Sequence, residues 1–111
     1  MHAFDVLGDP VRRRILELLA HGECGAGTLA ETVCAEFSIS QAAVSQHLKV
    51  LRVSGFAVPR KDGPRRIYAI EPDRFREVDD WLDRFRHVWQ PKLDALATEV
   101  ARRKKTRRTQ D

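Results

Sequence analysis

The sequence lacks long hydrophobic runs and is poor in cysteine. No run of about eighteen apolar residues occurs in its 111 residues, so we expect no membrane-spanning helix. The first residues lack a basic segment followed by a long apolar one, so we expect no secretion signal. Two cysteines, Cys24 and Cys34, are too few for a disulfide framework. These absences favour a protein of the reducing cytoplasm.

The residue combinations typical of enzymes are also missing. The sequence contains no nucleophile beside a base, no phosphate-binding glycine loop and no constellation of paired acids. It has no internal repeat. Its length and its 42% hydrophobic content predict one compact domain with a modest core. We therefore expect a binding protein without catalytic activity and without a cofactor.

Positive charge is concentrated in two regions. Residues 102–111 hold six basic residues and one acid, a net charge of +5 in a chain whose total is +4. Residues 37–66 hold another six basic residues and one acid. Basic patches bind phosphates because they displace the counterions condensed on nucleic acids. By itself this distribution fits a merely solvated surface, but the second region coincides with the helix described next, and this coincidence favours DNA as a partner.

The segment 38–51 predicts a short helix whose exposed face is small and polar. Ser40 suits the N-cap, and Val44, Leu48 and Leu51 recur at i, i+4 and i+7, the spacing of a face that packs on a core. The other face carries small or hydrogen-bonding residues, namely Gln41, Ala42, Ser45, Gln46 and Lys49. Such residues permit close approach to the major groove and hydrogen bonds to base edges. We expect this helix to bind DNA.

Two helices are expected before this one, preceded by a short helical turn at residues 3–7. The first begins with Asp9 as N-cap and Pro10 as its first residue. The second follows a flexible glycine-containing segment at 25–27, where Thr28 and Glu31 have the spacing of a capping box. The three helices together predict a helical bundle that ends in the polar-faced helix.

A hairpin and a long helix are expected after it. Two alternating runs, 56–61 and 65–70, flank the turn residues 62–64 and predict a β-hairpin. A long apolar stripe at helical spacing then predicts a final helix. Pro91 interrupts this stripe, and proline costs about 3 kcal/mol in a helix interior. We therefore expect a kink or a break between Val88 and Pro91.

This order of elements is that of a winged helix-turn-helix, mainly α with a small β-hairpin and a long C-terminal helix for dimerisation. The sequence resembles the ArsR/SmtB-type bacterial repressors in four segments: FDVLGDPVRRRILELL (4–19), QAAVSQHLKVL (41–51), SGFA (54–57) and GPRRIY (63–68). The resemblance implies a DNA-binding and dimerisation domain at 1–101, followed by a basic tail at 102–111. It also implies a homodimeric repressor that occupies an inverted-repeat operator and leaves it when an inducer binds.

On this resemblance, DNA is contacted by a recognition helix and by the hairpin, or wing. Gln41, Ser45 and Gln46 match positions near base edges, where a good bidentate pair gives about 1–3 kcal/mol of discrimination. The helix contributes Ser40, Gln41, Ala42, Ser45, Gln46 and Lys49, and the wing contributes Arg60, Lys61, Arg65 and Arg66. Wing arginines reach the backbone or a narrow minor groove. His47 falls between the two helix faces and is expected to pack or to hydrogen-bond locally.

The apolar stripe exceeds what so short a chain easily buries, so it predicts a partner. In the family the first and last helices pair across a two-fold axis, which places two recognition helices about 34 Å apart. The expected interface contains Phe4, Leu7, Trp81, Phe85, Val88, Trp89, Leu93 and Leu96. Packing of the stripe on the chain's own core is the alternative.

A metal sensor site is not expected. The family's Cys-x-Cys motif is incomplete, because Cys24 has no second thiol beside it and soft metals require converging thiolates. Asp83 and His87 have the i, i+4 spacing of metal ligands, but this pattern is common on solvated helices. Cys24 and Cys34 are expected to be inert, with redox sensing as the alternative. The inducer is therefore unknown.

Two further alternatives stay open at this point. The basic tail is either the frayed end of the last helix, where cations are favoured by the helix dipole, or an arm that contacts DNA. The whole chain is either a DNA-binding repressor or a winged-helix module for protein–protein contact. The small, polar face of residues 41–49 argues for the repressor.

Overall fold

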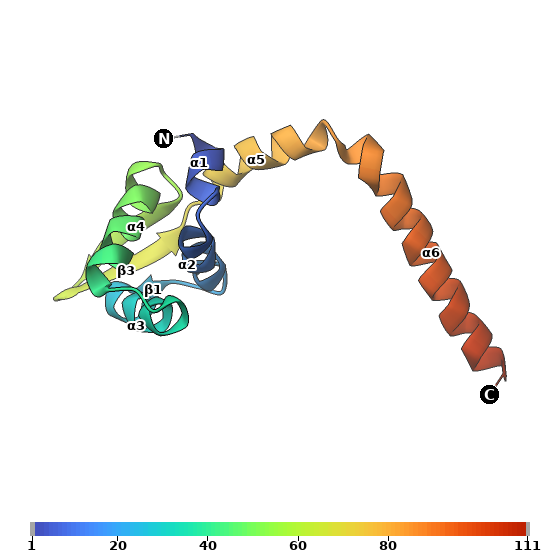
Figure 1. Cartoon of the computed structure of the whole chain (residues 1–111), viewed down its shortest axis with the longest axis horizontal. Helices are drawn as coiled ribbons and strands as arrows, with labels where there is room; N and C mark the ends of the chain where they lie inside the picture. Colours follow the sequence, from blue (N-terminus) through green and yellow to red (C-terminus); the bar gives the residue numbers. More distant parts are fainter. Residues whose placement is uncertain (1, 111) are drawn as a thin grey trace. The chain divides into compact units, whose positions relative to one another are not determined.

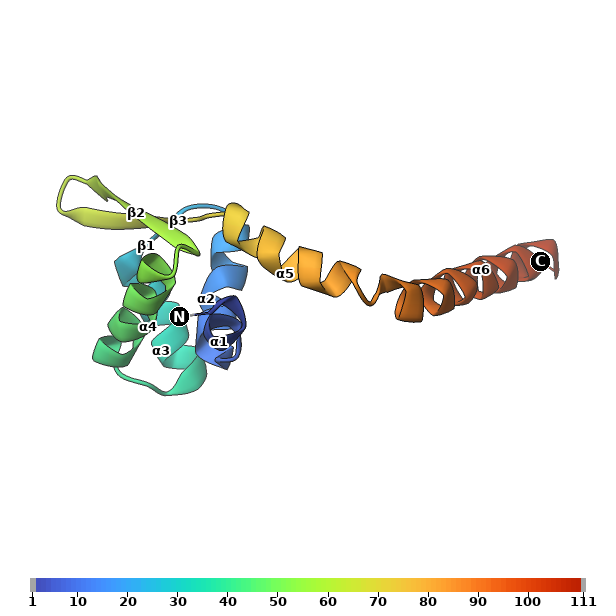
Figure 2. The same cartoon turned by 90° about the horizontal axis from the view of Figure 1, so that it is seen from above.

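The computed structural model describes residues 2–110, with side chains described through residue 107, and it divides the chain into two compact units, Met1–Val78 and Asp79–Asp111. Figures 1 and 2 show the elements. They are α1 (Ala3–Leu7), α2 (Pro10–Ala20), β1 (Cys24–Gly25), α3 (Ala26–Phe37), α4 (Gln41–Val53), β2 (Ala57–Asp62), β3 (Arg65–Ile70), α5 (Asp73–Asp83) and α6 (Arg86–Gln110). Over this described range, no helix has the length and apolarity needed to cross a membrane.

Helix α2 begins as the sequence predicts. The Asp9 carboxylate accepts hydrogen bonds from the amides of Val11 (2.8 Å) and Arg12 (3.1 Å), and Pro10 occupies the first turn. These bonds satisfy amides that have no partner inside the helix. The start of α2 is therefore fixed by local residues alone.

The wing is larger than the predicted hairpin. Strands β2 and β3 pair antiparallel from Ala57↔Ile70 to Asp62↔Arg65, and the short strand β1 adds to the other edge of β3. Gly63 occupies the first of the two turn positions with φ of 62°, a conformation that glycine adopts at little cost. The result is a three-stranded sheet in the order β1-β3-β2, not a free hairpin.

The predicted start of α3 is wrong. No capping box forms at Thr28 and Glu31; α3 begins at Ala26, with Gly25 as an N-cap that makes no side-chain hydrogen bond. Gly25 is not flexible, because it pairs with Ile67 as part of β1. The chain therefore turns directly from strand to helix, which places the capping-box residues inside α3.

The predicted recognition helix α4 is confirmed at both ends. At its start, the Ser40 hydroxyl accepts a hydrogen bond from a first-turn amide at 3.1 Å. At its end, Gly55 adopts a φ of 81° while its amide donates to Arg52 and the Phe56 amide donates to Leu51. This bond pair is the Schellman arrangement, which requires a left-handed residue. Both boundaries of α4 follow from short-range hydrogen bonds.

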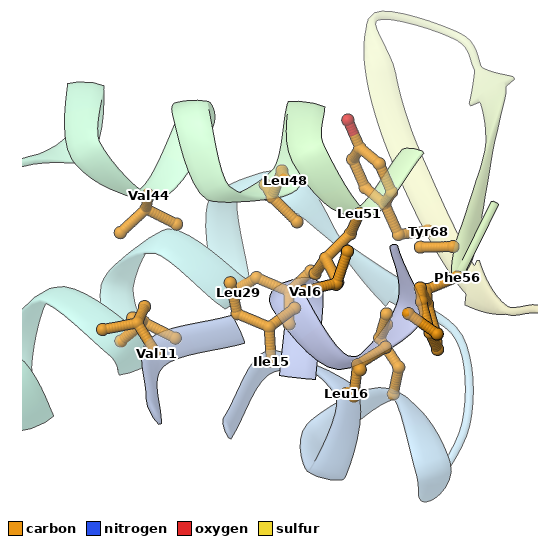
Figure 3. Packing of buried hydrophobic residues seen from close by; sticks show 14 residues of the cluster. Val6, Val11, Ile15, Leu16, Leu29, Val44, Leu48, Leu51, Phe56 and Tyr68 are labelled. Carbon is orange, nitrogen blue, oxygen red and sulfur yellow. The ribbon is translucent and has the colours of Figure 1, made fainter. Parts of the chain in front are cut away.

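The core of the first unit fixes which face of α4 is exposed. Val44, Leu48 and Leu51 are at most 4% exposed and pack with residues of the other elements around Ile15 and Phe56 (Figure 3). A fully buried side chain of this size contributes about 1.5–3 kcal/mol. The predicted apolar face of α4 is thus confirmed, and its polar face is left to the surface.

The helical break in the second unit lies earlier than predicted. Helix α5 ends at Asp83 and α6 begins at Arg86, while Pro91 lies inside α6. The Arg86 guanidinium binds the carboxylates of Asp83 and Asp79, which stabilises the new helix start. Pro91 has no backbone N–H, so α6 lacks only one backbone hydrogen bond at this position. The basic residues 102–110 continue α6 without a boundary.

Candidate DNA-binding surface

Every residue predicted to contact DNA is exposed in the structure. Six of them lie on α4 or at its cap, and four lie on β2 and β3. The helix group is Ser40, Gln41, Ala42, Ser45, Gln46 and Lys49, and the wing group is Arg60, Lys61, Arg65 and Arg66. Since core packing fixes the orientation of α4, its small polar residues form a surface that a groove can approach.

The cations of the first unit fall into two groups. Arg14 binds Glu36 at 2.8 Å, and Arg74 and Arg76 likewise have carboxylate partners. Arg12 and Arg13 donate to backbone carbonyls. Among the described residues of this unit, the Lys and Arg side chains that form neither kind of contact are Lys49, Arg52, Lys61, Arg65 and Arg66. All five lie on α4 and the wing, so unneutralised positive charge coincides with the predicted DNA-binding surface.

Arg60 differs from the other predicted wing residues. Its guanidinium binds Glu23 at 2.7 Å, and this hydrogen-bonded pair raises the pKa of Arg60 and lowers the pKa of Glu23. In the β2–β3 register, Lys61 and Arg66 share one face of the sheet, and Arg60 and Arg65 share the other. Because only Nη2 is bonded to Glu23, Arg60 can contact a phosphate through its other N–H groups or by exchanging this partner.

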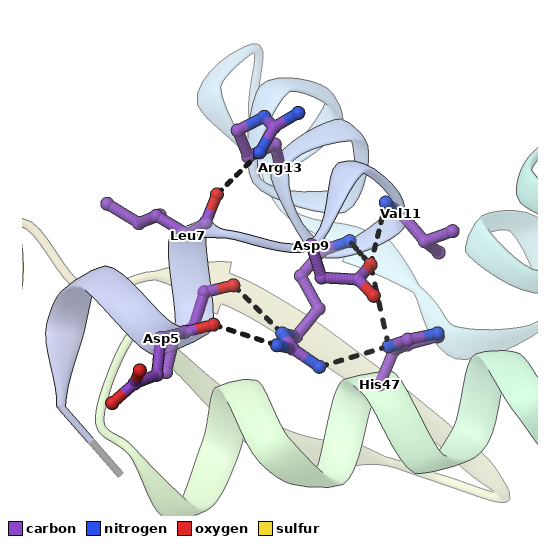
Figure 4. A network of polar contacts seen from close by, with 8 residues as sticks. Asp5, Leu7, Asp9, Val11, Arg13 and His47 are labelled. Carbon is purple, nitrogen blue, oxygen red and sulfur yellow. Dashed lines mark hydrogen bonds and ion pairs between the residues drawn. The ribbon is translucent and has the colours of Figure 1, made fainter.

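His47 makes the local contacts that the sequence predicts. Its Nδ1 lies 3.5 Å from an Arg12 nitrogen and 3.9 Å from the Asp9 carboxylate (Figure 4). Arg12 also donates to the carbonyls of Asp5 and Val6. One guanidinium therefore connects α1 and α2 with the side of α4, which holds the recognition helix in place.

A cleft that sequence reasoning missed opens between α4 and β3. It has a volume of about 340 Å³ and is lined by Ala26, Ser45, Leu48, Lys49, Arg52, Arg66 and Tyr68. Arg52 follows Ser45 and Lys49 at i+7 and i+3, and this spacing is the signal that could have added it to the predicted surface. The participation of Tyr68 depends on the sheet; its alternation with Ile67 and Ile70 predicts a half-buried residue, whereas it is buried, at 4% exposed.

The apolar stripe of the second unit is exposed. Among its residues, Trp81 is 44%, Val88 58% and Leu96 60% exposed, and the Trp81 and Phe85 rings lie 4.7 Å apart. Phe85 and Leu93 are also exposed, whereas Trp89 is half buried. In the first unit, Phe4 is 36% exposed and Leu7 is half buried. The predicted interface residues are therefore largely open to a partner.

The residues considered as metal ligands from the sequence, and the two cysteines, do not gather into a metal-binding cluster among the described residues. No group of three or more His, Cys, Asp or Glu side chains among the described residues could hold a metal ion. Asp83 accepts from Arg86, and Cys24 and Cys34 are free and partly buried. The structure thus offers no three-ligand site at the positions considered from the sequence.

Comparison with known proteins gives consistent matches. Residues 7–60 match the sequence pattern of a helix-turn-helix domain. The chain is 41% identical over 83 residues to the HTH-type transcriptional regulator Rv2034 of Mycobacterium tuberculosis, covering 75% of this chain and 74% of that protein. It is 30% identical to the transcriptional repressor SdpR of Bacillus subtilis, covering 76% and 89%. A crystal structure of an ArsR family transcriptional regulator superposes with a TM-score of 0.66 at 30% identity, covering 79% and 87%.

Proposed function

The chain belongs to the ArsR family of winged helix-turn-helix transcriptional regulators, and on this basis we propose that it is a homodimeric repressor that occupies an inverted-repeat operator. The family is one of DNA-binding regulators and not of enzymes. The observation that carries the proposal is the coincidence of the five unpaired cations with the polar face of α4 and the wing. We further propose that the protein acts in the cytoplasm.

The two parts of this surface have different roles in the proposal. Gln41, Ser45 and Gln46 on α4 read base edges, because amides and hydroxyls form the hydrogen bonds that distinguish base pairs. Lys61 and Arg66 on the wing bind phosphates or the minor groove, which positions the helix without selecting a sequence. Binding is therefore both sequence-specific and strongly dependent on salt.

The homodimer is proposed from the apolar stripe. The exposed Trp81, Phe85, Leu93 and Leu96 fit a self-complementary interface with a second copy. Phe4 and Leu7 on α1 are proposed to contact the second copy as well. Two recognition helices about 34 Å apart would then read two half-sites one DNA turn apart.

A gel-shift titration tests the proposal. The protein is titrated against DNA from the promoter of its own gene and against a scrambled control, at two salt concentrations. We expect preference for the promoter and an affinity that falls steeply with salt, with a slope of about −0.9 per phosphate contact. Absence of binding at the lower salt would reject DNA binding and favour the protein–protein module instead.

Release from the operator is proposed to follow binding of an inducer. A thermal-shift screen with metals, oxidants and small hydrophobic ligands would identify its class, because a ligand of the folded state raises the melting temperature. A ligand that raises this temperature and also weakens the gel shift is expected to be the inducer.

A further inference from the structure

The cleft between α4 and β3 gathers residues from three elements on one side of the first unit. Ser45, Lys49 and Arg52 form a strip along α4, and Arg66 and Tyr68, two residues apart, share a face of β3. The start of α3 completes the cleft. Because α3 has no side-chain cap, its first amides add a partial positive charge at that end.

The charge in this cleft is of one sign. Lys49, Arg52 and Arg66 line it, and none of the three has a carboxylate partner among the described residues. No acidic side chain is part of the lining. Three cations held around one cavity repel one another, so an anion placed between them lowers the free energy of the arrangement.

Tyr68 brings a hydroxyl group to the cleft. Tyr68 is only 4% exposed, and its hydroxyl forms no hydrogen bond with any other described residue. In Figure 3 its ring stands beside α4 and its hydroxyl points away from the other labelled side chains. The hydroxyl is not among the fully buried side-chain atoms that lack a partner, so solvent and small ligands in the cleft reach it. A tyrosine hydroxyl donates one hydrogen bond, which suits an anionic oxygen.

We propose that this cleft is a phosphate subsite that binds one backbone phosphate of the operator, with the Tyr68 hydroxyl and the Arg52 guanidinium as its donors. The inference rests on the proposed function. DNA is the favoured source of the phosphate because Ser45, which faces base edges in that function, lines the same cleft. A strand of DNA that runs beside α4 brings its phosphates next to this residue. Free phosphate has the same chemistry and competes for the site.

Two single substitutions test the subsite. Tyr68→Phe removes only the hydroxyl and is expected to lower operator and scrambled-DNA affinity alike by about tenfold, the effect of one hydrogen bond to a charged group. Its salt slope stays unchanged because no charge is lost. Arg52→Gln is expected to weaken both DNAs and to make the slope shallower by about 0.9. Arg76→Gln, which removes an exposed charge outside the cleft, is the control and leaves affinity unchanged.

A spectroscopic measurement observes the cleft directly. Tyr68 is the only tyrosine of the chain, so tyrosine isotope-labelled at Cζ gives one NMR resonance. This resonance is expected to shift on titration with operator DNA, and with inorganic phosphate at much higher concentration. The phosphate response is expected to disappear in Arg52→Gln. Thermal melting of Tyr68→Phe is expected to match the unsubstituted protein, since the hydroxyl has no intramolecular partner.

The outcomes separate the subsite from the proposed function. If the operator binds but neither substitution weakens binding and the Cζ resonance does not move, the subsite is overturned and the repressor stands. If no DNA binds at low salt, the repressor fails. In that case, a resonance that still responds to inorganic phosphate supports an anion site for a free ligand, and one that does not respond overturns the subsite too.

Discussion

Asp9 is both the N-cap of α2 and a neighbour of the recognition helix. It caps α2 through two backbone amides, and it lies close to His47 of the recognition helix. Partial burial raises the pKa of its carboxyl, but the amide hydrogen bonds and the nearby His47 and Arg12 outweigh burial and lower the pKa below 3.8. The ionised form is thus the one that the folded state prefers.

Substitution of Asp9 is expected to destabilise the first unit. Asp9→Ala should lower the free energy of unfolding by about 0.5–2 kcal/mol at neutral pH, because the cap is lost. Since the folded pKa is lowered, the carboxylate stabilises the fold above its ordinary pKa, and this stabilisation is lost as the pH falls through the folded pKa. Urea unfolding across acidic pH measures both effects. Asp9→Asn keeps a capping oxygen and should lose less; equal stability of Asp9→Ala and the unsubstituted protein would contradict the role of the cap.

Base reading and phosphate binding are separable by substitution. Ser45→Ala with Gln46→Ala should reduce discrimination between operator and scrambled DNA by about 1–3 kcal/mol per lost base contact. Arg65→Ala should weaken both DNAs equally. Competition gel shifts measure the ratio. A changed sequence preference in Arg65→Ala would show that this residue reads bases.

At the scale of elements, α6 contains a proline at which the expected break does not occur. The break lies at Arg84 and Phe85, where the Arg86 guanidinium binds two aspartates of the preceding helix. The break therefore coincides with these exposed ion pairs and not with Pro91, although pairs of this kind contribute at most about 1 kcal/mol.

Pro91→Ala is expected to stabilise α6 without moving the break. The substitution restores one backbone hydrogen bond and removes a steric clash, an effect of up to about 3 kcal/mol on the helix. Circular dichroism should show greater helicity, and backbone chemical shifts of Arg84 and Phe85 should remain non-helical. Fusion of α5 and α6 into one continuous helix would assign the break to the proline after all.

Elements defined by neighbouring residues were predictable from the sequence, and those defined by distant ones were not. The caps at Asp9 and Ser40 and the glycine end of α4 are local signals, and the structure contains all three. The start of α3 depends on pairing between Gly25 and Ile67, which lie far apart in the chain. A two-residue strand has no periodicity of its own to detect.

The same distinction applies to the candidate site. The exposed face of α4 follows from helical spacing, so its residues could be named in advance. The carboxylate partner of Arg60 could not be named in advance, because Glu23 is 37 residues away in the sequence and lies next to Arg60 only in the folded sheet. The enclosure of Tyr68 by α4 likewise depends on tertiary packing.

At the scale of the whole molecule, the exposed apolar stripe predicts self-association. Leu93→Asp with Leu96→Asp should give a monomer by sedimentation at micromolar concentration and should abolish the concentration dependence of melting. Operator affinity should fall, because the two DNA-binding surfaces are no longer linked and each half-site is bound separately. Thr98→Asp places a carboxylate elsewhere on α6 and should leave the dimer intact. A monomeric unsubstituted protein would contradict the symmetric operator arrangement.

The short strand β1 has a mechanical consequence. It ties the base of the wing at Ile67 and Tyr68 to the connection between α2 and α3, while the turn at Gly63 has no such attachment. The wing is therefore held firmly at its base by three paired strands, whereas its tip can bend. Amide hydrogen exchange should be slow at the base and fast at the turn. A small tilt at the base displaces the tip further, so the strength of two backbone pairings sets how widely Lys61 moves.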